Sequence, residues 1–488
     1  MQSKGAEVIH LGHNRSAQEI VEAAIQEDAQ GIAITSYQGG HIEFFKYMYD
    51  LLKERNCSHI KIFGGGGGTI LPIEIEELHK YGIAKIYSPD DGRKMGLEGM
   101  IEDVVKQCDF ETVSKLNGQV DKLNQNEWKN IAQLITLAEN GKSSIKNQKS
   151  EIPVLGITGT GGAGKSSVTD EIVRRFLRNF KDKTIAVISV DPSKKKTGGA
   201  LLGDRIRMNS ISSPRAYMRS LATRESDRAL SEHVQEAIDV CKAAHFDFII
   251  LESAGVGQSD ASILDYCNVS MYVMTPEYGA ASQLEKIDML DFADVIALNK
   301  FDKRGALDAL RDVKKQYKRN HGLWEAKDNE LAIVGTIAAQ FNDTGVNELF
   351  IKLLNAVAQK TGVNFMATLM AGHHDFTNAV QSTIIPPKRV RYLAEIAEVI
   401  KTYDDYVKHQ SEWASKWYQI SGVVTQLSSA TENTKAELML SLQEIESKID
   451  STNRQLIQNW EALQERYKKE FYEFQVREIG RASCRERV

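Results

Sequence analysis

The sequence has no paired cysteines, no excess of charge of one sign and no long apolar run. Its five cysteines show no C-x-x-C spacing, which argues against a disulfide framework or a zinc site: Cys57, Cys108, Cys241, Cys267 and Cys484. The 61 basic and 66 acidic residues give a net charge of −5, and so no overall attraction to nucleic acid or membranes. No apolar run could span a membrane and no signal peptide is visible, so we expect a protein of the reducing cytoplasm.

The most specific motif is a glycine-rich segment, Gly159-Thr-Gly-Gly-Ala-Gly-Lys-Ser166, which satisfies G-x-x-x-x-G-K-S. It follows an apolar run at 152–157 and precedes a helical pattern, so we expect a strand, a phosphate loop and a helix in that order. Such a loop turns backbone N–H groups toward a polyphosphate, and Lys165 adds a mobile charge near the β- and γ-phosphates. A glycine-rich turn without a ligand is the alternative. The predicted nucleotide contacts here are Gly159, Gly161, Gly162, Ala163, Gly164, Lys165, Ser166 and Ser167.

Acidic residues at later strand ends are candidate magnesium ligands. Apolar strands at 184–190 and 246–251 end at Asp191 and Glu252, and carboxylate oxygens are ligands that Mg²⁺ prefers. Asp191 could instead cap the following helix. The predicted magnesium residues are Ser166, Val190, Asp191, Asp204, Glu252 and Ser253.

The segment between these strand ends, 194–208, is too rich in glycine for a stable element, and we expect it to order around a γ-phosphate. Within it, Arg207 is a candidate phosphate contact. Further along, Gly255 can offer its N–H to the γ-phosphate. Gln258 could orient the attacking water, although a structural hydrogen bond explains it equally well. The predicted catalytic residues are Lys165, Arg207 and Gln258.

A fourth motif, Asn299-Lys300-Phe301-Asp302, follows an apolar strand at 295–298. A carboxylate at Asp302 accepts hydrogen bonds from the N1–H and 2-amino group of guanine, which adenine lacks, so the motif predicts GTP rather than ATP. The segment 336–339 is expected to contact the base through its backbone.

Residues 1 to about 110 alternate short apolar strands with helices, which indicates a parallel sheet with crossover helices. The predicted strands include 7–11, 31–35, 60–63 and 84–87. Ser36 and the glycine run 64–68 fall beyond strand ends, where such sheets bind ligands. His10, His13 and His41 lack a third ligand at a suitable spacing, and we expect no metal there.

These motifs carry two resemblances. Residues 1–112 resemble the cobalamin-binding domain of acyl-CoA mutases through Ser36, Gly64-Gly65 and the segments 7–16 and 87–92. The resemblance implies that Ser36, Gly64 and Gly65 line the pocket for the nucleotide tail of adenosylcobalamin. The family's D-x-H-x-x-G loop, whose histidine ligates cobalt, is not in this sequence.

Residues 151–370 resemble the GTPases that chaperone cobalamin-dependent mutases, through G-T-G-G-A-G-K-S, D-P-S, T-G-G-A-L-L-G-D-R-I-R-M, E-S-A-G-V-G-Q-S-D and N-K-F-D. The resemblance implies GTP hydrolysis with Mg²⁺, coupled to loading and protection of the cofactor. The domain order is similar to that of fused isobutyryl-CoA mutases, which implies a missing substrate barrel that interconverts isobutyryl-CoA and n-butyryl-CoA. We also expect a homodimer.

The expected organisation has an α/β fold class: a truncated flavodoxin-like cobalamin-binding domain at 1–112, a helical linker at 113–150 and a P-loop GTPase at 151–370. A helical region at 371–477 leads toward the missing barrel, and residues 478–488 resemble the translation of a sequencing adapter. Two other functions remain open. A GTPase of the nickel-delivery type would need a histidine-rich tract or paired cysteines, and a cobalamin carrier would bind GTP without hydrolysing it.

Overall fold

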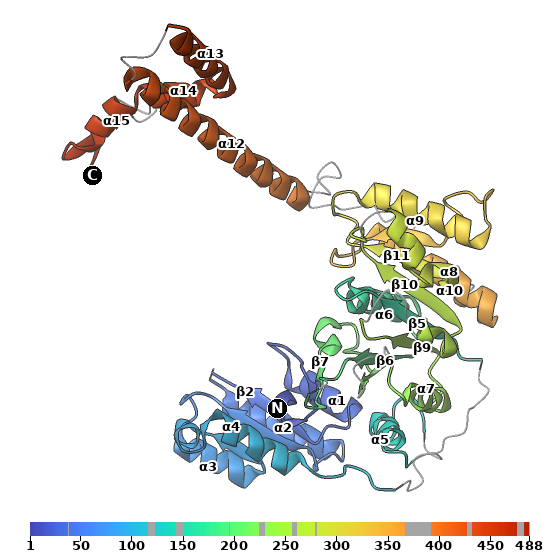
Figure 1. Ribbon diagram of the computed structural model, residues 1–488. Coiled ribbons are helices and arrows are strands. Elements are labelled where there is room, and N and C mark those ends of the chain that lie inside the picture. Colours follow the sequence, from blue (N-terminus) through green and yellow to red (C-terminus); the bar gives the residue numbers. More distant parts are fainter. Residues whose placement is uncertain are drawn as a thin grey trace. The chain divides into compact units, whose positions relative to one another are not determined.

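A computed structural model of the chain shows two compact units, Met1–Ile384 and Ile385–Val488 (Figure 1). The structure describes residues 1–37, 39–115, 123–142, 151–194, 196–223, 230–255, 261–278, 281–366, 392–426, 432–475 and 483–487, without the side chains of Ala281 and of residues from 471 onward. The predicted α/β class is confirmed by the parallel sheets of the first unit, which alternate with helices along the chain. No helix among the described residues is long and apolar enough to cross a membrane.

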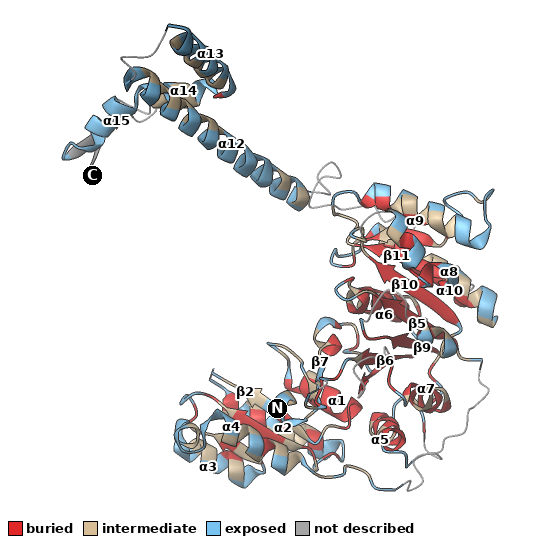
Figure 2. Cartoon of the chain, viewed as in Figure 1, coloured by how far each residue is buried: buried red, intermediate tan, exposed pale blue. Residues whose placement is uncertain are grey.

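The larger sheet has seven strands in the order β12-β11-β10-β5-β9-β6-β8, and each neighbouring pair is parallel. Its strands are largely buried (Figure 2), as expected for a parallel sheet with helices on both faces. The strands are β5 (Val154–Gly159), β6 (Ile185–Asp191), β8 (Ala216–Ala222), β9 (Phe248–Glu252), β10 (Val269–Met274), β11 (Val295–Asn299) and β12 (Ile333–Thr336).

Alternate strand residues divide the core between the two faces of this sheet. Ile157 and Ile250 pack on the face covered by α6 (Lys165–Asn179) and α10 (Thr344–Thr361). Val154 and Ile249 pack on the face covered by α5 (Trp128–Glu139) and α7 (Val234–Ala243). Beside β10–β12 lie α8 (Met289–Phe292), α9 (Ala306–His321) and the short helices η4 (Ser262–Asp265) and η5 (Ala281–Lys286).

The N-terminal region has a smaller parallel sheet, β2-β3-β4. Its first helix begins where Ser16 and Glu19 form a reciprocal capping box. The elements are η1 (Gln2–Lys4), α1 (Ala17–Gln26), β2 (Gly31–Thr35), α2 (His41–Glu54), β3 (Lys61–Gly65), α3 (Pro72–Tyr81), β4 (Lys85–Tyr87) and α4 (Pro89–Cys108).

The sequence analysis predicted the wrong pairing partner for one strand. The run 7–11 was expected to join the N-terminal sheet, but only β1 (Val8–Ile9) forms, and it pairs in parallel with β7 (Leu201–Leu202). Two residues carry little register information, so the position of β1 is set by the segment it meets. The segment 194–208 also differs from its prediction, because it contains β7 and η3 (Asp204–Arg207) rather than no stable element.

Helix α5 lies in the stretch expected to be a helical linker, and it is a core element. Ile131, Leu134 and Ile135 are fully buried, and α5 packs against both α1 and α7. One hydrophobic cluster therefore continues from the N-terminal region through α5 to the seven-stranded sheet.

The second unit is mainly helical, with a short antiparallel strand pair near the end of the chain. Gln410 on α12 donates to the Lys448 carbonyl oxygen (3.0 Å) and accepts from the Asp450 N–H (2.8 Å). These bonds fasten the end of α13 to α12. The elements are α12 (Tyr392–Gln426), α13 (Glu432–Lys448), α14 (Ser451–Gln458), α15 (Trp460–Tyr467), β13 (Phe471–Gln475) and β14 (Ser483–Arg487).

Candidate nucleotide site

The phosphate loop joins β5 to α6, as the sequence predicts. Two of its glycines are required by close contacts. A Cβ added at Gly159, where φ is +153°, would lie 2.0 Å from the Val273 carbonyl oxygen. At Gly164, where φ is +93°, it would lie 2.4 Å from Asn299 Nδ2. The loop is thus held against β10 and the N-K-F-D segment by backbone that only glycine provides.

Ser166, in the first turn of α6, lies between two carboxylates. Its Oγ is 2.7 Å from Asp204 Oδ1 and 2.9 Å from Glu252 Oε1, and all three residues are buried. Thr169, one turn further, donates to Glu252 Oε2 (2.8 Å), and Ser189 donates to the other Asp204 oxygen. The structure therefore brings together three of the predicted magnesium residues, from α6, η3 and β9.

The hydroxyl of Ser166 cannot donate a hydrogen bond to both carboxylates at the same time. The Ser166 hydroxyl has one hydrogen for two carboxylate neighbours. Burial, followed by the charge of Asp204, raises the pKa of Glu252 to about 8, which favours a shared proton when no cation is present. A hydroxyl and two carboxylates are an all-oxygen donor set of the kind that Mg²⁺ prefers, and a divalent cation would supply the missing positive charge.

The other predicted magnesium residues lie beside this cluster. Asp191 Oδ2 accepts the Gly203 N–H (2.8 Å), and burial, with the nearby charge of Asp204, raises the pKa of Asp191 to about 6. Val190 is a buried apolar residue of β6, and Ser253 donates to Thr158 Oγ1 (2.9 Å). In the described ranges, no three His, Cys, Asp or Glu side chains are placed to hold a metal, so a cation at this site needs Ser166 and phosphate oxygens as well.

Lys165 is buried above the phosphate loop. Its Nζ donates to the Gly159 carbonyl oxygen (3.2 Å) and lies near Gly255, while burial lowers the pKa of the amine. Gly255 and Gly161 are also neighbours, so the loop after β9 meets the phosphate loop as expected. Gln258 lies outside the described residues.

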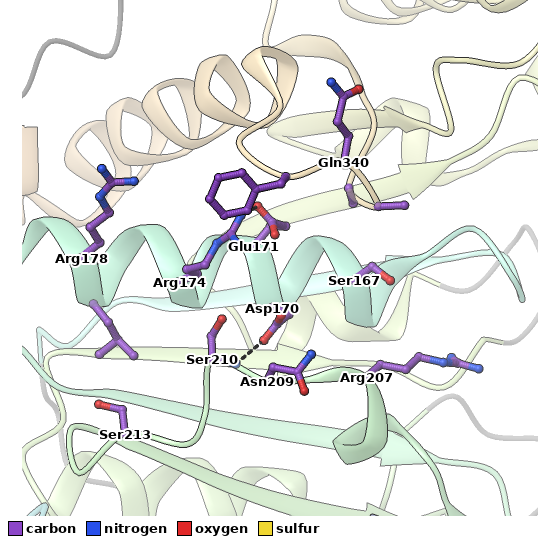
Figure 3. A pocket seen from close by; sticks show the side chains of 14 residues that line it. Ser167, Asp170, Glu171, Arg174, Arg178, Arg207, Asn209, Ser210, Ser213 and Gln340 are labelled. Carbon is purple, nitrogen blue, oxygen red and sulfur yellow. Dashed lines mark hydrogen bonds and ion pairs between the residues drawn. The ribbon is translucent and has the colours of Figure 1, made fainter. Parts of the chain in front are cut away.

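A groove runs along α6 from the nucleotide site (Figure 3). Arg207 and Ser167 lie at one end of it. Arg174 packs over the ring of Phe341, 4.9 Å from its centroid, and the Ser210 N–H donates to Asp170 Oδ1 (2.7 Å). Ser167 and Arg207 were predicted from the sequence, but Asp170, Glu171, Arg174 and Arg178 were not, although a spacing of three and four places them with Ser167 along the same side of α6.

Asn299 fastens the phosphate loop to the predicted base-contact segment. Its Nδ2 donates to the Ala163 carbonyl oxygen (2.9 Å), and its Oδ1 accepts the Ala338 N–H (3.1 Å). Lys300 follows with a left-handed backbone, and the Phe301 N–H donates to the Thr336 carbonyl oxygen (3.0 Å). Asp302 then lies half-buried at the same sheet edge. The two segments expected to hold guanine are thus adjacent.

The predicted cobalamin contacts meet at the carboxyl ends of β2 and β3, although Gly64 and Gly65 are the last two residues of β3 and do not lie beyond it as predicted. The Ser36 N–H, after β2, donates to the Gly65 carbonyl oxygen at the end of β3 (2.9 Å). At Gly64 an added Cβ would lie 2.5 Å from the Phe45 ring, so packing inside this region already explains that glycine. His10 Nδ1 accepts the Gly12 N–H (2.9 Å), and His41 Nε2 lies 3.1 Å from Glu74 Oε2.

Comparison with known families identifies the region that contains the larger sheet. Residues 131–385, slightly more than half of the chain, match the profile of the methylmalonyl-CoA mutase-associated GTPase MeaB. The chain belongs to the MeaB family. Residues 1–90 match the B12 binding domain, so this MeaB-family chain also carries a cobalamin-binding domain. The predictions of a GTPase and of a cobalamin-binding domain are both confirmed.

Several curated proteins are similar in sequence to this chain. The chain is 50% identical to the fused isobutyryl-CoA mutase of Geobacillus kaustophilus and 48% identical to that of Cupriavidus metallidurans, over 98% of the chain in each case. It covers only 45% and 44% of those proteins, so it spans less than half of their length. It is also 34% identical to the methylmalonic aciduria type A homolog of Caenorhabditis elegans, over 30% of this chain and 37% of that protein.

Proposed function

We propose that this MeaB-family chain hydrolyses GTP with Mg²⁺ and uses the nucleotide cycle to load and protect adenosylcobalamin in an acyl-CoA mutase. The observation that supports the site assignment is the placement of the Ser166 hydroxyl between Asp204 and Glu252, one residue from the Lys165 amine. When bound, Mg²⁺ would neutralise charge on the β- and γ-phosphates.

The residues have distinct roles in this proposal. Ser166, Asp204 and Glu252 hold the cation, with Asp191 acting on Asp204 through the Gly203 N–H. Lys165 exchanges its bond to the Gly159 carbonyl for the terminal phosphates, and the amides of the phosphate loop and of Gly255 surround them. In the first unit, Arg207 completes the phosphate contacts from η3.

The proposal for guanine rests on the segment that Asn299 fastens to the phosphate loop. Asp302 accepts the N1–H and 2-amino hydrogens of guanine, with Lys300 and Phe301 as neighbours of the base. At the other sheet, Ser36, Gly64 and Gly65 receive the nucleotide tail of the cofactor. The parent protein would interconvert isobutyryl-CoA and n-butyryl-CoA and act as a homodimer, in keeping with its resemblance to the fused mutases.

Phosphate release with GTP and with ATP, each with and without Mg²⁺, tests this function. We expect release only with GTP and Mg²⁺, and none from Lys165→Ala with an unchanged circular dichroism spectrum. Lys181→Ala, which removes an exposed lysine after α6, is the matched control and should keep the wild-type rate. GTP binding without phosphate release would instead indicate a cobalamin carrier that only senses the nucleotide. If the folded wild-type chain does not bind GTP with Mg²⁺, the assignment is wrong.

A further inference from the structure

We propose that Glu27, in the cobalamin-binding region, is a positioning residue of the GTP site: it holds Asp204 beside Ser166 by fixing Arg205. This inference rests on the proposed function, because it assigns Asp204 to the cation site. It makes the cobalamin-binding region a structural part of the GTPase rather than a separate domain that only receives its output.

The short helix η3 presents neighbouring residues to two different regions. Asp204 faces the phosphate-loop helix, 2.7 Å from Ser166 Oγ. Arg205 faces the end of α1: its Nε donates to Glu27 Oε1 (2.9 Å) and its Nη2 to Gln26 Oε1 (3.0 Å). Consecutive Cα atoms are about 3.8 Å apart, so contacts that fix the backbone at Arg205 also limit where the Asp204 carboxylate can lie.

Glu27 is itself held firmly. Its side chain is 2% exposed, and it accepts hydrogen bonds from both the N–H and the hydroxyl of Ser220, each 2.9 Å long. Ser220 lies in β8, the edge strand of the large sheet. A buried ion pair adds little net stability, because desolvation offsets much of the attraction, but it can fix a register. Here it fixes η3 against a rigid strand.

Two more contacts from the same region hold this segment. Strand β1 pairs with β7. Only Gly203, the N-cap residue of η3, separates the end of β7 from η3. Arg15 donates to the Ile206 carbonyl oxygen (3.1 Å) and to Asn209 Oδ1 (3.2 Å). Residues 8–27 thus contact the segment 201–209 at three places, while the opposite side of η3 carries Asp204. These contacts explain how a glycine-rich segment is held in an ordered conformation.

The test is the Mg²⁺ dependence of nucleotide binding in the intact chain, measured with a fluorescent GTP analogue. We expect Glu27→Gln to raise the Mg²⁺ concentration for half-maximal binding by about tenfold, because the bond that Arg205 donates to this side chain is no longer charge-assisted. Affinity for the analogue in EDTA should stay within about twofold, because the phosphate loop is unchanged. Glu22→Gln, on the same helix but bonded to Gln18, is the matched control and should leave both values unchanged.

A double-mutant cycle separates positioning from general loss of structure. Arg205→Gln should shift the Mg²⁺ dependence as Glu27→Gln does, and the double variant should be no worse than either single one. If Glu27→Gln fails to fold, Arg15→Met, which removes a partly exposed contact to the same segment, should still give a smaller shift in the same direction.

The outcomes are distinct. If Glu27→Gln and Arg205→Gln both bind the GTP analogue with the Mg²⁺ dependence of the wild-type chain, this inference is wrong, but the proposed function is not affected. If the chain in its wild-type form shows no Mg²⁺-dependent GTP binding, the proposed function fails, and this inference fails with it.

Discussion

Arg175, on the helix that follows the phosphate loop, should be the main support of the base-contact segment. The residue is 4% exposed. Its Nε donates to Asn347 Oδ1 (2.8 Å), its Nη2 to the Asp343 carbonyl oxygen (3.2 Å), and its Nη1 pairs with Glu171. We predict that Arg175→Met destabilises this region and weakens GTP binding, because methionine keeps much of the side-chain packing but none of the donors.

The magnitude follows from the partners that are left behind. Removing one member of a buried ion pair costs about 3–5 kcal/mol. The lower end applies here, because Glu171 keeps a second partner in Arg174 (2.5 Å). We therefore expect a loss of about 3 kcal/mol, equivalent to roughly a hundredfold faster hydrogen exchange at the most protected amides of α6 and α10.

The effect on the nucleotide arises through the same contacts. Asp343 Oδ1 accepts the Ile337 N–H (3.1 Å), and the next amide, of Ala338, donates to Asn299. When Arg175 no longer holds residue 343, this chain of bonds loosens beside the guanine site, and GTP affinity should fall about tenfold.

Native-state hydrogen exchange of the intact chain, combined with GTP titration, measures both effects. Arg178→Met is the control: Arg178 is three residues along α6 and exposed, so it should change neither quantity. Unchanged exchange in α6 and α10 of Arg175→Met would refute the reasoning, as would an Arg178→Met variant that loses as much protection.

Three further predictions address the nucleotide site. Lys165→Ala should abolish GTP hydrolysis in a phosphate-release assay, because the ammonium group that would neutralise charge on the β- and γ-phosphates is removed. Asp302→Asn should weaken GTP binding by about 2 kcal/mol or more and improve binding of the xanthosine analogue, because an amide donor faces the C2 oxygen of xanthine; equal preference before and after the change would contradict this. Gly159→Ala should lower the thermal midpoint and prevent nucleotide binding, because its Cβ would lie 2.0 Å from the Val273 carbonyl oxygen. A fully stable, GTP-binding Gly159→Ala protein would contradict the steric argument.

The sequence predicted the parts of the site that depend on local pattern. The phosphate loop, the strand ends at Asp191 and Glu252, and the N-K-F-D segment follow from apolar runs that end at polar residues. The carboxyl ends of parallel strands meet at one sheet edge, so these residues could be placed together before the fold was known. The roles of individual residues at this edge stay predictions.

Contacts between distant segments could not be predicted in this way. Nothing near Glu27 or Arg205 in the sequence shows that they form an ion pair across 178 positions. The segment 194–208 looked unstructured because its glycines give no local preference, yet β1 and α1 supply the order from outside. The strand at 7–11 was placed in the wrong sheet for the same reason, because its apolar pattern does not specify a partner.

The edge of the seven-stranded sheet explains why the N-terminal region docks where it does. Among the described strands, β8 has a neighbour on one side only, so every second residue directs its N–H and C=O outward. These groups are taken by side chains rather than by another strand: Gln26 Nε2 donates to the Ala216 carbonyl, Arg205 Nη2 to the Met218 carbonyl, and Glu27 accepts the Ser220 N–H.

Such an edge would otherwise invite pairing with another chain. Because the bond to the Met218 carbonyl comes from Arg205, this part of the edge is covered only while η3 keeps its position beside the phosphate loop. A movement of η3 that withdraws Arg205 would leave this buried carbonyl oxygen and Glu27 with fewer partners, at a cost of about 1–3 kcal/mol for each unsatisfied group. The sheet edge therefore opposes displacement of Asp204, and any nucleotide-driven change in this segment must either keep the Arg205 bonds or replace them.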